Sequence, residues 1–138
     1  QNHCRSLRGW LVSSHPKAET DMPTAPETVA VTQPVIPTSF MLGAHIHTVR
    51  TDENLYEADG NRNIGQFDQT RQTIKIQTPC RGFDPTPATT AGTYYHELAH
   101  AILHHLDRKE LDEDERLVEA LGRALHQIDA TKAGALEV

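Results

Sequence analysis

The sequence predicts an α+β domain in which a small antiparallel or mixed β-sheet packs on two helices. Apolar and polar residues alternate after Ser39 and again over residues 73–77, which is the period of half-buried strands. Two later segments, 87–106 and 112–128, carry apolar residues at helical spacing. We expect the sheet to pack on the first helix and the second helix to complete the functional site.

Residues 1–38 form an arm that we expect to be extended or partly disordered. Five of the eight prolines of the chain lie in it: Pro16, Pro23, Pro26, Pro34 and Pro37. Each proline removes a backbone donor and disfavours helix in the residue before it. The apolar segment 10–12 can dock on a groove of the core or of a partner, but a mobile tail is the simpler interpretation. The domain itself is therefore expected to span residues 39–138.

The first strand region begins near Ser39 and continues through a run of alternating residues. One of its faces carries Ala44, Ile46 and Thr48. His45 and His47 share the opposite face, since side chains two apart on a strand point the same way. Paired histidines on a strand can bind metal, but without a third ligand nearby we expect these two to face solvent.

Turn residues separate this region from a second strand. The first turn is expected at residues 59–61, Asp-Gly-Asn, and the second at residues 68–71. Residues 73–77 then form a strand with Ile74 and Ile76 on one side.

The first helix is predicted from Pro87 to Leu106. Thr86 is a suitable N-cap, and proline fits the first helical position because its missing N–H has no partner there. Residues 107–116 are expected to form a charged connection to a second helix over residues 112–128. That helix has one apolar stripe: Leu117, Leu121, Ala124, Leu125 and Ile128.

The first helix contains His-Glu-Leu-Ala-His at residues 96–100, a pattern that favours a catalytic zinc site. Side chains four apart on a helix point the same way, so the imidazoles of His96 and His100 can meet one tetrahedral Zn²⁺. Glu97 lies about 100° round the helix, where its carboxylate can act as general base on a metal-bound water. Burial of two unpartnered imidazoles would cost about 1 to 3 kcal/mol each, which favours a bound ion.

A catalytic zinc needs a third protein ligand, and the second helix offers two candidates. Measured round the helix from Leu121, Glu115 lies about 120° and Glu119 about 160° from the centre of the apolar stripe. Glu115 is therefore preferred as the metal ligand, with Glu119 hydrogen-bonded to a ligating histidine. The opposite assignment stays open, because Glu119 leaves a longer connection after His100.

Three further residues near the motif carry groups that could take part in the site. His104 continues the four-residue spacing, but three histidines on one straight helix span about 12 Å, too far for a single ion. We expect His104 at the rim of the site or hydrogen-bonded to one of the ligands. Tyr94 and Tyr95 are expected to pack in the core, with stabilisation of an oxyanion as the alternative.

Composition restricts the partners of the chain. Its formal net charge is −6, which argues against binding to a polyanion such as nucleic acid. The sequence has no run of 18 or more apolar residues, so a membrane span is not expected. Cys4 and Cys80 are too few for a disulfide framework, and a reduced, cytoplasmic protein is predicted.

The segments TIKIQT, TYYHELAHAILHHL and ERLVEALGRAL together resemble the small zinc peptidase-like proteins of phages and mobile elements, related to the ImmA/IrrE type. The resemblance covers about residues 39–129 and is most specific in HELAHAILHH. It implies a minimal gluzincin in which His96, His100 and a glutamate of the next helix hold zinc while Glu97 aids peptide hydrolysis. The chain departs from the family pattern at residues 119–121, where Glu-Ala-Leu replaces Glu-Ala-Asn.

Two functions from different classes follow. The first is a zinc-dependent peptidase whose polypeptide substrate lies extended as an added strand at the sheet edge. The second is a non-catalytic zinc-binding module for regulation or interaction, of phage or mobile-element origin. Glu97 favours the peptidase, because a structural zinc site would not need it. A third, weaker hypothesis is a domain without metal, in which the histidines are core residues.

Overall fold

The computed structural model describes residues 30–55 and 63–137. The expectations for the arm before residue 30, including its apolar segment 10–12, and for the turn at residues 59–61 lie outside these residues. A compact unit begins at Gln33 and holds all the strands and helices described below.

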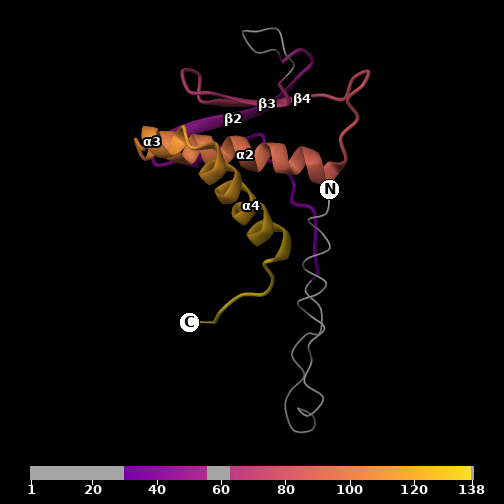
Figure 1. The fold of residues 1–138 in the computed structure, drawn as a ribbon. Helices are drawn as coiled ribbons and strands as arrows, with labels where there is room; N and C mark the ends of the chain where they lie inside the picture. The colour runs from indigo at the N-terminus through magenta and orange to yellow at the C-terminus, as the bar shows by residue number, and fades with distance from the viewer. Residues whose placement is uncertain (1–29, 56–62, 138) are drawn as a thin grey trace. The chain divides into compact units, whose positions relative to one another are not determined.

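Four strands form one mixed sheet in the order β1-β2-β4-β3 (Figure 1). The β2–β4 pair is parallel, and the β1–β2 and β3–β4 pairs are antiparallel. Their bounds are β1 Ser39–Leu42, β2 His45–Asp52, β3 Gly65–Asp68 and β4 Thr73–Gln77. The predicted α+β class with a small mixed sheet is confirmed. The strand predicted at residues 73–77 lies in the interior of the sheet, and β3 is an edge strand.

Three helices follow the sheet along the chain: α2 Pro87–His105, α3 Lys109–Asp112 and α4 Glu115–Thr131. The predicted start of the first helix is confirmed, since the Thr86 hydroxyl accepts a hydrogen bond from the Thr89 amide at 3.1 Å. The last helix begins later than predicted because Asp114 caps it by accepting from two amides of its first turn. Among the described residues, no helix is both long and apolar enough to cross a membrane.

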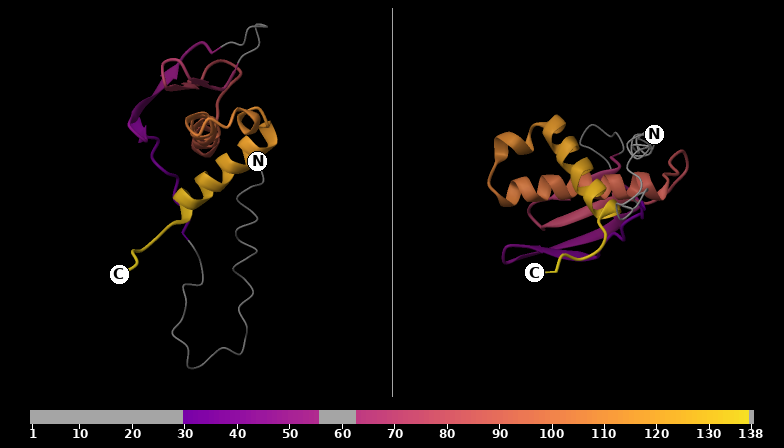
Figure 2. Two further views of the ribbon diagram at one scale, coloured as in Figure 1. Left: turned by 90° about the vertical axis from the view of Figure 1, so that its left-hand side faces the viewer. Right: turned by 90° about the horizontal axis from the view of Figure 1, so that it is seen from below.

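Helix α2 lies between the sheet and α4, as the end-on view of Figure 2 shows. On the sheet side, Ile74 and Ile76 of β4 pack against Tyr94 and Tyr95, so the expected core position of both tyrosines is confirmed. On the other side, Val118 of α4 packs against a small cluster on α2 that comprises Ala99 and Leu103. The His-Glu-Leu-Ala-His segment thus lies on the helix between the sheet and α4.

Helix α4 crosses α2 in direct backbone contact at Gly122. A Cβ atom at Gly122 would lie 3.0 Å from the Tyr95 carbonyl oxygen and 3.1 Å from the His96 Cα. The predicted stripe centred on Leu121 is confirmed only in part. Leu121 and Leu125 pack against the core clusters, but the fully buried positions of α4 are Val118, Gly122 and Ala130, and Ile128 is 59% exposed. Because Gly122 has no side chain, the face of α4 that contains Val118 and Gly122 lies close to the backbone of the motif.

The predicted faces of the first strand region are also wrong at His47. His47, expected to face solvent, is only 2% exposed, whereas Ile46 on the opposite face is 62% exposed. The His47 imidazole stacks between two phenyl rings, with centroid separations of 5.1 Å to Phe40 and 6.0 Å to Phe67. Phe40 is its partner across the β1–β2 ladder, so the strand pairing favours burial of the histidine over the isoleucine.

Candidate metal centre

Helix α2 and the first turn of α4 bring three potential ligands together. The Glu115 Oε2 lies 3.2 Å from the His96 Nε2, and the Glu115 Oε1 lies 3.2 Å from the His100 Nε2. Within the described part of the chain, this is the only group of three such residues whose ligand atoms all lie within 4.8 Å of one another. Its members are the two histidines and the preferred glutamate of the sequence analysis.

The donor set and its spacing fit a zinc ion. Ligand atoms that lie 2.0 to 2.1 Å from one tetrahedral Zn²⁺ are about 3.3 Å apart, close to the two nitrogen–oxygen separations in this group. Two imidazoles and one carboxylate leave a fourth position for water, as in catalytic zinc sites. The Glu115 side chain is 65% exposed, so solvent reaches the group from the α4 side.

Two further carboxylates, those of Glu119 and Asp112, face the Nδ1 atoms of the two imidazoles. The His96 Nδ1 lies 2.9 Å from the Glu119 Oε2, and the His100 Nδ1 lies 2.6 Å from the Asp112 Oδ1. When each Nδ1–H donates to its carboxylate, the Nε2 lone pairs are left to face Glu115. Glu119 therefore lies where a supporting residue is expected, and Glu115 lies where a ligand is expected.

Asp112 did not stand out in the sequence. It lies in an acidic stretch, residues 107–116, in which neither spacing nor motif distinguishes one carboxylate from another. Only the short helix α3 turns its side chain back toward His100.

Glu97 is buried beside the three potential ligands and is only 9% exposed. Burial raises the pKa of its carboxyl and Glu115 raises it further, while the nearby His96 and His100 and a hydrogen bond from the Phe67 amide oppose the shift. A group with a raised pKa near a metal site is suited to accept and return a proton.

The edge strand β3 lies directly against Glu97 because Gly65 has no side chain. A Cβ atom at Gly65 would lie 3.1 Å from the Glu97 Cγ and 2.6 Å from the Thr93 Cγ2. Nothing in the sequence singled out this glycine, since the approach of a strand to a helix is a tertiary contact. Gly65 therefore sets the distance between the sheet edge and the zinc motif.

An open cleft of about 360 Å³ lies between β3 on one side and helices α2 and α4 on the other. Its walls include Gly65, Gln66 and Phe67 on the strand side and His96, Glu97, His100 and Glu115 on the helix side. His104, expected at the rim of this site, instead lines a separate hollow with His45 and His47. Tyr94 and Tyr95 are also absent from the walls of the cleft.

Comparison of the chain with protein-family models, with curated proteins and with solved structures found no match. The resemblance to the ImmA/IrrE type therefore stays a prediction. The function is inferred below from the geometry of the metal centre.

Proposed function

We propose that the chain is a zinc-dependent peptidase that hydrolyses a polypeptide by means of a metal-activated water. The observation that supports this most strongly is the buried carboxylate of Glu97 beside the group formed by His96, His100 and Glu115, without being part of it. A structural zinc site is closed by four ligands and has no use for a further, buried carboxylate.

The residues of the chain divide the chemistry between them. Zinc bound at this centre supplies a water of lowered pKa and polarises the substrate carbonyl. Glu97 takes the proton of the attacking water and returns it to the leaving amine, a task that suits its raised carboxyl pKa. Glu119 and Asp112 hold the two imidazoles in the tautomer that leaves Nε2 free.

The outer edge of β3 offers the carbonyl groups of Gly65 and Phe67 to an extended substrate, since the N–H groups of these two residues already donate to Asn63 and to Glu97. The Ile64 carbonyl accepts a hydrogen bond from the Gln77 amide at 3.0 Å, so in the alternating ladder the backbone groups of Gly65 and Phe67 point away from β4. They point toward the cleft, where the Phe67 amide contacts Glu97. A peptide added to β3 as a further strand would carry its backbone past the metal centre.

The substitution Glu97→Gln tests the proposal. Cleavage of an unfolded protein mixture should fall by about 10²- to 10⁴-fold, the usual contribution of a general base, while bound zinc stays at the native level. Glu113→Gln is the matched control, because Glu113 is an exposed acid that pairs with Lys109 on the surface. Both quantities are measured on the same preparations, cleavage by peptide mass spectrometry and zinc by elemental analysis.

Two outcomes contradict the peptidase. Zinc-loaded native protein that cleaves nothing would support the non-catalytic zinc-binding module instead. Native protein that takes up no zinc at all would leave only the domain without metal.

A further inference from the structure

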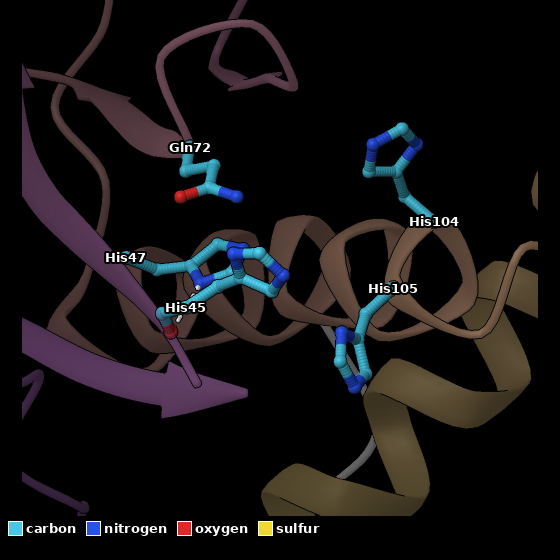
Figure 3. A pocket seen from close by; sticks show the side chains of 5 residues that line it. All are labelled: His45, His47, Gln72, His104 and His105. Carbon is cyan, nitrogen blue, oxygen red and sulfur yellow. Dashed lines mark hydrogen bonds between the residues drawn. The ribbon is translucent and has the colours of Figure 1, made fainter. Parts of the chain in front are cut away.

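A second group of histidines lies at the C-terminal end of α2 (Figure 3). His45 and His47 come from β2, and His104 and His105 from the last turn of α2. Together with Gln72 they line a hollow of about 160 Å³ that contains no carboxylate among its lining residues. None of these histidines belongs to the metal centre proposed above.

We propose that His45, His47 and His105 form a second site for a divalent transition metal, separate from the centre at His96. The two strand residues are two apart and therefore project from the same face of β2. The third residue approaches from the helix, with a separation of 6.2 Å between the ring centroids of His45 and His105. In Figure 3 the ring of His104 is directed away from that of His105, so we leave it outside the ligand set.

The donor chemistry selects the class of metal. Imidazole nitrogens suit Zn²⁺, Cu²⁺ and Ni²⁺, whereas Ca²⁺ and Mg²⁺ require oxygen ligands. Three histidines form one of the known catalytic zinc ligand sets and leave a fourth position open for water or a small anion.

His47 is held in the form that a metal ligand requires. Its Nδ1 lies 3.3 Å from the His45 carbonyl oxygen, and donation of the Nδ1–H to that oxygen leaves the Nε2 lone pair available. Its two aromatic neighbours, Phe40 and Phe67, fix the plane of the ring.

The turn between β1 and β2 makes room for the helix ligand. Gly43 has a φ angle of 57°, and a Cβ atom there would lie 2.9 Å from the His105 Cε1. Any larger residue would be strained by that backbone conformation and would also displace the ring. The glycine thus allows the imidazole of His105 to lie against the end of β2.

Metal binding at this site requires a rotation of two side chains. The described residues hold a ready-made group of three ligands only at His96, His100 and Glu115. His45 and His105 are exposed, so their rings are free to turn toward His47, which stays fixed. The ordering of two side chains costs conformational entropy, and we therefore expect the second site to bind zinc more weakly than the first.

Zinc titration of the metal-free full chain by equilibrium dialysis tests the proposal. The native chain should bind two equivalents, and the double variant His100→Ala/Glu115→Ala should retain the weaker one. Addition of His105→Ala to that double variant should weaken the remaining equivalent by at least the 10- to 100-fold that loss of an outer partner costs. His104→Ala in the same background is the matched control and should change the affinity less than twofold.

Imidazole NMR spectra of the native chain locate the second equivalent directly. The ring signals of His45, His47 and His105 should shift as the second equivalent of zinc is added, while those of His126 should not. Retention of that equivalent in the His105→Ala variant, or its equal loss in His104→Ala, would overturn the proposal. A native chain that binds one equivalent, lost only with His105→Ala, would support this site while contradicting the centre at His96.

Discussion

At the scale of single residues, the metal centre depends on which imidazole nitrogen each carboxylate faces. Glu115 faces the Nε2 atoms of both motif histidines, whereas Glu119 and Asp112 each face an Nδ1. As plain ion pairs, partly exposed contacts of this kind contribute only about 0 to 1 kcal/mol to stability. Four such contacts, made by three carboxylates around two histidines, are better explained by a bound metal than by a need to stabilise the fold.

Substitution of the three carboxylates should therefore separate a ligand from its supports. Glu119→Gln and Asp112→Asn are expected to lower zinc affinity about 10- to 100-fold, because each removes the acceptor that orients one imidazole. Glu115→Gln should lower it further, because it removes a charged ligand. Competition with a chromogenic chelator measures all three affinities, with Glu113→Gln as the surface control. The reverse order for Glu115 and Glu119 would assign the ligand role to Glu119.

The extent to which these residues could be predicted follows from how local their geometry is. The facing of His96 and His100 is a property of any helix, so the sequence alone predicted it. Which of Glu115 and Glu119 is the ligand depends on how α4 packs on α2. A helical wheel of α4 alone could favour one of them but could not decide. Asp112 depends on the turn of α3, for which a run of acidic residues gives no signal.

At the scale of secondary-structure elements, the crossing of α2 and α4 positions the centre. Both candidate ligands, Glu115 and Glu119, lie on α4, and Gly122 sets the distance between α4 and His96. The same crossing explains why the predicted apolar stripe was displaced: a wheel weighs side chains by hydrophobicity, whereas a close contact selects the smallest residue. The start of α2 was predictable because Thr86 and Pro87 are local signals.

The substitution Gly122→Val should move α4 away from α2. The added side chain meets backbone atoms, which cannot rotate away, so overpacking should cost about 1 to 3 kcal/mol. A gain of up to about 1 kcal/mol from removing a helical glycine offsets part of this cost. We expect a lower free energy of unfolding in urea and, because Glu115 and Glu119 move with α4, weaker zinc binding.

Gly92→Ala provides the control for this test. Gly92 is also a helical glycine, but a Cβ atom there meets nothing within 4 Å. It should stabilise the domain by about 0.5 to 1 kcal/mol and leave zinc affinity unchanged. Equal effects of the two substitutions would show that helix propensity, not the crossing, controls stability at Gly122.

At the scale of the whole molecule, the proposed metal centre would link elements that share little apolar surface. The cluster between α2 and α4 is built on three buried residues, Ala99, Leu103 and Val118, of which one is an alanine. The larger cluster lies on the sheet side of α2. A metal held by α2 and α4, with Asp112 of α3 as a support, would therefore stabilise the contact between these helices, which bury few apolar residues against each other.

Removal of zinc should for this reason lower the thermal stability of the entire domain. A ligand present at 100 times its Kd stabilises the folded state by about 2.7 kcal/mol, and each kcal/mol moves the unfolding midpoint by roughly 2 to 8 °C in small domains. A chelator should thus lower the midpoint of the native chain by at least about 5 °C in a calorimetric scan. Glu97→Gln should show the same shift, because Glu97 is not a ligand, whereas Glu115→Gln should show little. If neither chelator nor added zinc changes the unfolding midpoint of the native chain, α2 and α4 are held together by packing alone. The carboxylates around His96 and His100 would then have another role.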